Sequence, residues 1–263
     1  MKTRTLVVVG VLVLIWSLLM HAPAANLYAW FAPKNSPVEL YGLDGDIARG
    51  KVQTVSLGGH PLLQSLRWRF QPWWLPLLRL SFAVEGGQDL NLDGRVALGP
   101  AGGVDVSGAH AGGGVKAMLG LAGIPFVPVD GQVRLNLDSL KLRKGFPSSA
   151  AGTLEVHGLA WTLVKDPQPL GDFKATITTE RPTTGTSGGN TIKAVIEPIA
   201  GPVDASGEVH LLADRSYDYD LQLKARDSSN ATLNNMMQSL GQPDTRGYYH
   251  LRNRGTLAGA PPR

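Results

Sequence analysis

The chain has 263 residues with 32 glycines, 18 prolines, no cysteine and only 17% charged residues. The lack of cysteine excludes disulfides, thiol catalysis and cysteine-ligated zinc, while abundant glycine with little charge argues against a coiled coil and favours a sheet with many turns. The net charge of +4 is scattered rather than gathered in a basic block, which excludes a nucleic-acid footprint and leaves a mild preference for anionic surfaces.

The N-terminus predicts a membrane anchor. Residues 1–5 include two basic side chains, and the apolar run that follows extends over residues 6–25. This run reaches the roughly 20 residues that a spanning helix needs. Because the basic flank precedes the run and none directly follows it, we expect a cytoplasmic tail at 1–5 and a single transmembrane helix at 6–25.

A cleaved signal peptide is the alternative interpretation. Ala22-Pro23-Ala24 has the small-x-small form of a cleavage site. In either case the rest of the chain is exported, so we expect the bulk of the protein in the periplasm. Residues 26–37 contain Pro33 and Pro37 and are interpreted as a stalk.

Alternating apolar and polar residues dominate residues 38–257, which predicts a mainly β domain of largely antiparallel strands. Gly-rich turns separate the alternating segments. The clearest segments are Leu90–Leu98, Val133–Leu137, Phe173–Ile177, Ile192–Ile196, Val203–Leu211 and Tyr217–Ala225, with two more at Leu66–Phe70 and Arg79–Val84.

Two of the longer runs change phase. Leu140 and Leu142 are out of step with the alternation that starts at Val133, and Leu159 is out of step with Val156 beside a glycine. One extra residue in a strand bends it and re-aims the side chains that follow, so these phase changes predict β-bulges.

One or two short helices are expected within the sheet. Leu233, Met236, Met237 and Leu240 have helical spacing, with Ser229 or Asn230 before them as a cap and Gly241 after them as a stop. A second helix is expected within 115–121. Residues 258–263 are interpreted as a disordered tail.

No motif for catalysis, a cofactor or a metal is predicted. Gly185–Gly189 matches the nucleophile elbow around Ser187, but strand-like sequence follows it where that motif requires a helix. The His157/Glu155 and His210/Glu208 pairs lie two residues apart, which suits the solvated face of a strand better than a metal site. We therefore expect a protein that is not an enzyme.

The one-sided alternation raises the question of what covers the apolar face. An antiparallel sheet can be polar on one side and apolar on the other, and its apolar side must be covered. Packing of the sheet against itself is the first interpretation. Binding of a lipid is the second.

Three segments in order along the chain resemble a known family. They are Gly42-Leu-Asp-Gly45-Asp-Ile-Ala-Arg-Gly50, then Leu66-Arg-Trp68-Arg-Phe70-Gln-Pro72-Trp73-Trp74-Leu75, and a C-terminal run with Pro243, Gly247-Tyr248-Tyr249, Leu251 and Gly255-Thr-Leu257. With the short basic N-terminus and the single apolar run, they resemble the type II secretion system protein N (GspN) family.

This resemblance implies an accessory inner-membrane component of the general secretion machine, which exports folded proteins from the periplasm. It implies an open, curved β-sheet akin to AsmA-like lipid-channel proteins, other inner-membrane secretion components as partners, and no catalytic residues. A candidate contact with a partner or the membrane comprises Trp68, Phe70, Pro72, Trp73, Trp74 and Leu75. The alternative is that this segment plugs the core at one end of the sheet.

Overall fold

The computed structural model describes residues 21–31, 38–57, 60–72, 79–87, 90–99, 102–121, 127–163, 166–181, 189–227 and 230–257. The chain divides into two compact units, Met1–Val96 and Ala97–Arg263. Each unit contributes β-strands joined by short connections, which confirms the prediction of a mainly β protein.

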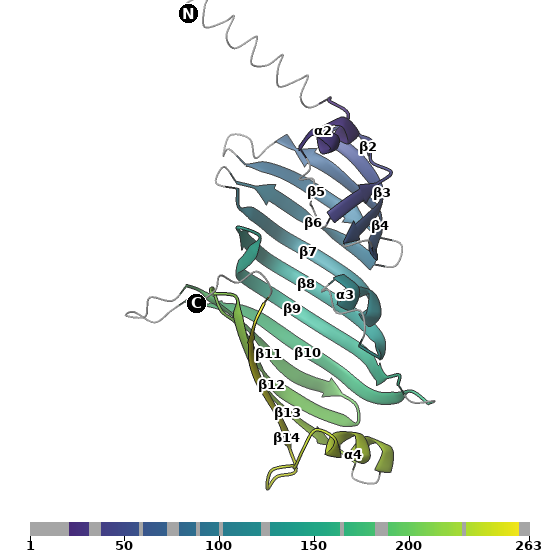
Figure 1. Cartoon of the computed structure of the whole chain (residues 1–263), viewed down its shortest axis with the longest axis vertical. Coiled ribbons are helices and arrows are strands. Elements are labelled where there is room, and N and C mark those ends of the chain that lie inside the picture. Colours follow the sequence, from purple (N-terminus) through teal and green to yellow (C-terminus); the bar gives the residue numbers. More distant parts are fainter. Residues whose placement is uncertain are drawn as a thin grey trace, which may run out of the picture. The chain divides into compact units, whose positions relative to one another are not determined.

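In its described residues, the first unit combines one short helix with a run of strands (Figure 1). Its strand order is β1-β3-β4-β5-β6, with the two-residue β2 paired to β3. The pairs β1–β3, β2–β3, β3–β4 and β4–β5 are antiparallel. The elements are α2 (Ala24–Phe31), β1 (Val38–Tyr41), β2 (Asp44–Gly45), β3 (Arg49–Leu57), β4 (His60–Gln71), β5 (Leu80–Gly86) and β6 (Leu90–Leu98).

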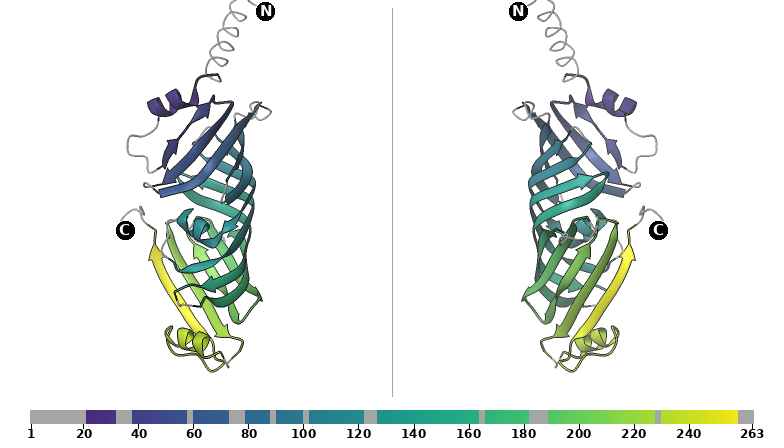
Figure 2. Two further views of the ribbon diagram at one scale, coloured as in Figure 1. Left: turned by 90° about the vertical axis from the view of Figure 1, so that its right-hand side faces the viewer. Right: turned by 90° about the vertical axis from the view of Figure 1, so that its left-hand side faces the viewer.

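The second unit is an antiparallel meander in which each strand pairs with the next along the chain, from β7 to β14. Its sheet is curved in both views of Figure 2. The elements are β7 (Val104–Gly114), α3 (Val115–Leu121), β8 (Val129–Arg143), β9 (Phe146–Trp161), β10 (Gln168–Glu180), β11 (Thr191–Ala200), β12 (Val203–Leu211), β13 (Ser216–Ala225), α4 (Ala231–Gln238) and β14 (Tyr249–Thr256).

Both predicted helices are confirmed. The first is α3, and the second is α4, which begins after Asn230. The Asn230 side chain accepts a hydrogen bond from the backbone N–H of Leu233 at 3.0 Å. That bond satisfies one of the N–H groups that a helix leaves unpaired at its start, which explains why the helix begins there.

The predicted bulges are also confirmed. The register of β8 with β9 shifts between Leu137 and Ser139, where the sequence alternation changes phase. The second shift falls at Gly158, which has a φ of +60° and separates Val156 from Leu159. A positive φ favours glycine because it has no Cβ, so the sequence can make this bulge without strain.

The start of the chain differs from the prediction in one respect. The expected stalk at 26–37 is helical as far as Phe31, because its first proline comes only at position 33. Residues 6–20 of the predicted transmembrane helix lie outside the described residues. Within the part of the chain that the structure describes, no helix is both long and apolar enough to cross a membrane.

Two apolar clusters lie in the core of the described part of the second unit. In the first, Val115 of α3 packs with Val129 and Val133. In the second, Leu233 and Met237 of α4 pack on Val203 of β12, and each of the three is at most 2% exposed. The helices therefore cover two areas of the apolar side of the sheet.

Candidate functional site

An apolar groove in the second unit is the most distinctive concave feature of that sheet. It has a cavity volume of about 390 Å³, within the size range of sites for small molecules. It is bounded by α4 and by strands β9 to β14. Its lining is almost wholly apolar and comprises Leu159, Trp161, Leu170, Phe173, Ile196, Val203, Ala205, Ser206, Leu221, Leu223, Met236, Met237, Ser239, Leu240 and Leu251.

Strand alternation places these side chains on one face. Ala205 lies opposite Leu223 in the β12–β13 register, and Leu221 lies opposite Leu251 in the β13–β14 register. Residues directly opposite on neighbouring antiparallel strands point to the same side. The alternation that predicted the strands therefore also builds the apolar wall.

The bulge at Gly158 extends this wall into β9. Without it, Leu159 and Trp161 would point away from the side occupied by Leu154 and Val156. In the structure all four pack against the same cluster beneath α3, and Leu159 and Trp161 also line the groove. The extra residue thus joins the area covered by α3 to the area covered by α4.

The opposite face of the same strands is polar. Lys193 binds Glu208 at 2.8 Å, and this hydrogen bond is the main cause that raises the pKa of Lys193. His210 Nδ1 lies 2.9 Å from Asp218, and the Arg252 side chain lies 2.8 Å from Asp220. The polar side chains on this face therefore pair with one another, while the groove lies on the opposite, apolar face.

Asp244 organises the connection from α4 to β14, two elements that border the groove. Its carboxylate accepts hydrogen bonds from the backbone N–H groups of Arg246 and Tyr248 at 2.8 and 2.9 Å. It also lies 3.0 Å from His250 Nε2. The bond with His250 and the backbone donors lower the pKa of Asp244 to about 2.

The structure brings together only part of the contact segment predicted from the sequence. Trp68 and Phe70 are half-buried on one face of β4, and the Phe70 ring lies 5.5 Å from that of Phe82. The Trp68 indole N–H donates to the Ile47 carbonyl at 3.2 Å. Pro72 is exposed, whereas Trp73, Trp74 and Leu75 lie outside the described residues.

The residues tested for chemistry are spread over the sheet. Ser187 lies outside the described residues, and the elements before and after it are the paired strands β10 and β11. His157 lies 3.6 Å from both Glu155 and Asp172. Among the residues that the structure describes, no group of three or more His, Asp and Glu side chains is arranged to hold a metal.

Sequence reasoning did not single out the groove. The alternation identifies its strand residues as apolar positions, and helical spacing predicts one helix face with Met236, Met237 and Leu240, although α4 ends at Gln238, before Leu240. The missing information was which strand positions this helix covers, because α4 shares the groove with residues of β9 and β10 that lie about 60 to 80 positions earlier in the chain.

Fold and groove together define a protein built on antiparallel sheet with one polar side and one apolar side, the latter partly covered by short helices. The chain belongs to the family of type II secretion system (T2SS) protein N, whose sequence pattern matches residues 36–252. This match confirms the family resemblance seen in the sequence. No curated protein and no solved structure matches the chain significantly.

Proposed function

We propose that this protein is a non-catalytic accessory component of the type II secretion machine in the cell inner membrane. Membership of the family supports involvement in type II secretion. In the proposal, residues 6–25 cross the membrane once, the N-terminus is cytoplasmic, and the β-domain in the periplasm binds other inner-membrane secretion components.

The position of the family match carries this proposal. The match begins at residue 36, beyond the apolar N-terminal run, and extends to residue 252. What the family shares is therefore the β-rich part of the chain. A shared role in one machine is most simply carried by the shared part, with the N-terminal run serving as attachment.

Recovery of the full-length protein from membranes tests this role. We expect secretion components to co-purify after extraction in mild detergent, and we expect deletion of the gene to reduce the proteins secreted by the type II route. A normal set of secreted proteins in the deletion strain, together with no co-purifying component, would contradict the proposal.

The contact segment can be tested in the same strain. Replacing Trp73, Trp74 and Leu75 with alanine should weaken co-purification if the segment binds a partner. The matched control replaces exposed apolar residues of the second unit, namely Leu163, Ile199 and Leu257, which are 69%, 48% and 42% exposed. If the two triple variants weaken co-purification equally, the contact segment has no special role in binding a partner.

The apolar groove favours a second function, which is binding of a lipid acyl chain. A cavity of about 390 Å³ with an almost wholly apolar lining has few groups to hold a polar ligand. A hydrocarbon chain would replace water against Trp161, Phe173 and Leu223 without leaving a polar group unpaired. This function is the kind expected of AsmA-like relatives.

A variant that fills the groove tests the second function. Ala205→Phe places a ring in the groove, whereas Gln222→Phe places the same ring on the polar side of the neighbouring strand. We expect native mass spectrometry of the full-length protein to detect a bound lipid in the wild type and in Gln222→Phe but not in Ala205→Phe. If no lipid is bound to the wild type or to either variant, binding of a lipid acyl chain in the groove is refuted.

A further inference from the structure

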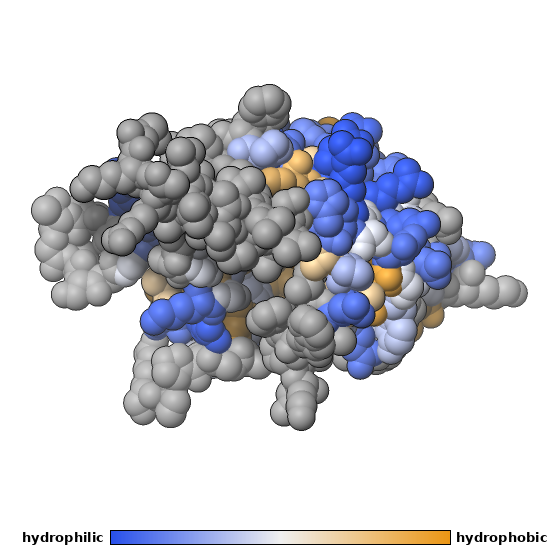
Figure 3. Space-filling view, turned by 90° about the horizontal axis from the view of Figure 1, so that it is seen from above, coloured by the Kyte–Doolittle hydropathy of each residue, from blue (hydrophilic) through white to orange (hydrophobic). Residues whose placement is uncertain are grey.

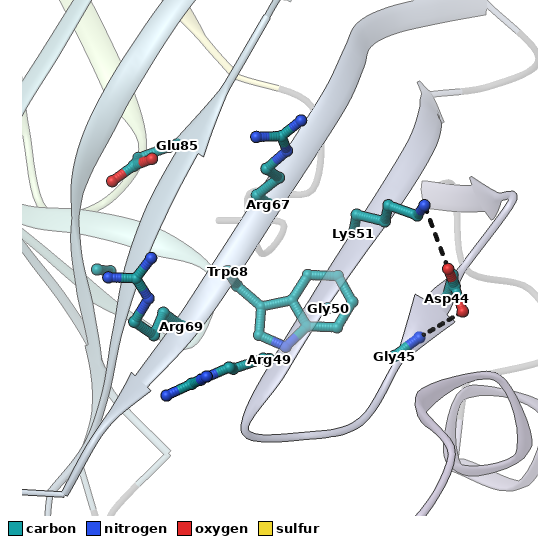
Figure 4. Close-up of a pocket in the computed structure, with 10 residues that line it drawn as sticks. Asp44, Gly45, Arg49, Gly50, Lys51, Arg67, Trp68, Arg69 and Glu85 are labelled. Atoms are coloured by element: carbon teal, nitrogen blue, oxygen red, sulfur yellow. Dashed lines mark hydrogen bonds and ion pairs between the residues drawn. The ribbon is translucent and has the colours of Figure 1, made fainter.

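Four cationic side chains gather on one face of the first unit (Figure 4). Arg49 and Lys51 lie on β3, and Arg67 and Arg69 lie on β4. In the strand register Arg49 is opposite Arg69, and Lys51 is opposite Arg67. All four are exposed, and they border a cavity of about 400 Å³. We refer to these four residues as the cationic cluster.

The pairing of like charges is unfavourable for the sheet alone. Side chains directly opposite on antiparallel strands have Cβ atoms roughly 5 Å apart, and like charges at that spacing destabilise the pair. The cluster contains two such pairs in succession. Hydrophilic side chains predominate among the described residues on the face shown in Figure 3. A hydrophilic surface does not by itself explain why two pairs of cations lie directly opposite each other.

Acidic neighbours neutralise only part of this charge. Lys51 Nζ lies 3.3 Å from Asp44, and Glu85 is opposite Arg67 on β5. Within the described residues, the side chains of Arg49, Arg67 and Arg69 make no ion pair. With respect to the described part of the chain, three guanidinium groups are therefore available, and such groups bind phosphate oxygens through paired N–H donors.

Trp68 holds the two strands of the cluster together from the opposite face. Its indole packs over Gly50, where a Cβ would collide with the ring, and its N–H donates to Ile47. Because Trp68 lies between Arg67 and Arg69 in sequence, fixing its ring also fixes the backbone that carries both arginines. The cluster is thus mounted on a braced pair of strands.

The cluster is also tied to the end of the apolar N-terminal run. Pro23 forms a bridge with Asp46, and the Asp46 carboxylate accepts a hydrogen bond from the Arg49 N–H at 2.6 Å. Helix α2, which follows Pro23, contacts β2. The end of the apolar run at Pro23 is therefore held next to the turn that leads into Arg49, the first cation.

We propose that the cationic cluster binds the anionic phospholipid headgroups of the membrane in which residues 6–25 are embedded. The inference rests on the proposed anchor, since Pro23 lies near the outer end of that span and its bridge to Asp46 would bring β2 and β3 to the headgroup region. Each arginine or lysine near an anionic membrane surface strengthens association about fivefold. The cluster thereby orients the first unit on the membrane.

Photocrosslinking of the full-length protein in lipid-bilayer discs tests the site. The discs contain phosphatidylcholine and a small fraction of photoreactive phosphatidylglycerol or, in parallel, photoreactive phosphatidylcholine. We expect peptides that cover residues 44–71 to crosslink at least fivefold more to the anionic lipid. Raising the salt concentration should reduce only the crosslinks to phosphatidylglycerol, because counterions screen exposed charges.

Two charge-matched variants separate the cluster from net charge. Replacing all four cluster residues with glutamine should abolish the preference for phosphatidylglycerol, so that the two lipids crosslink about equally. The control variant R134Q/K141Q/K144Q/R226Q removes four exposed cations of the second unit and should keep the preference. A variant with lysine in place of Arg49, Arg67 and Arg69 should retain most of it.

Several results would overturn the proposal. Equal crosslinking to both lipids by the wild type would do so, as would an unchanged preference in the glutamine variant. If that variant lost a co-purifying protein but kept its lipid crosslinks, the cluster would be a site for an acidic protein. Release of the wild type from membranes by alkaline carbonate would instead refute the anchor. In that case the cluster would be tested by adding the full chain to phosphatidylglycerol vesicles, and no binding would refute the cluster as well.

Discussion

Packing of α4 on the sheet can be tested by Leu233→Ala. Leu233 is 1% exposed and lies between Val203 and Met237, each 2% exposed. The substitution removes roughly three methylene-sized groups at ~0.8 kcal/mol each, or about 2.4 kcal/mol of transfer free energy. In a closed core the empty cavity would add to this loss. Because α4 borders the groove, it can shift and partly fill the cavity, so we expect a total loss of stability of about 2–3 kcal/mol.

Hydrogen exchange measures this loss where it occurs. A local destabilisation of about 2.4 kcal/mol corresponds to a roughly 50-fold faster exchange of the protected amides in α4. The control is Leu163→Ala, which deletes the same atoms at a side chain that is 69% exposed and should cost less than about 0.5 kcal/mol. Similar exchange in the two variants would refute the packing of α4 and, with it, the closed side of the groove.

Three further predictions follow from single residues. Asn230→Ala removes the cap of α4 and should cost about 1 kcal/mol, measured by urea unfolding, whereas Asn230→Asp should retain most of the stability because its carboxylate can accept the same bond. In the folded protein the pKa of Asp244 is lowered to about 2. The stability that its ionised carboxylate contributes is therefore fully present above its ordinary pKa near 3.8 and is lost as the pH falls through about 2. A carboxyl titration by NMR with a midpoint near 3.8 would contradict the hydrogen bonds to Asp244. Gly50→Ala should displace the Trp68 indole and lower the free energy of unfolding by about 1–3 kcal/mol. The control is Gly112→Ala, where a Cβ would meet only a carbonyl oxygen at 3.8 Å and should have no such steric cost. Equal losses of stability in urea unfolding would show that the indole does not pack on Gly50.

Much of the fold could be predicted because it depends on local patterns. The alternation at Val203–Leu211 identifies β12, since successive strand residues point to opposite faces. The phase change beside Gly158 identifies a bulge, since only an extra residue restores the apolar side. Asn230 and the helical spacing of the residues after it identify α4. The family was recognisable for the same reason, because its motifs are short and contiguous.

The sequence by itself therefore determined the mainly β class, many of the strands and their faces, the two helices and the family. Only the tertiary structure decided which distant residues meet. The groove requires α4 to lie beside residues of β9 and β10, and the cationic cluster requires the register that sets Arg49 against Arg69 and Lys51 against Arg67. A shift of two residues in that register would change every such pairing while keeping the apolar faces matched, so the alternation alone cannot specify it.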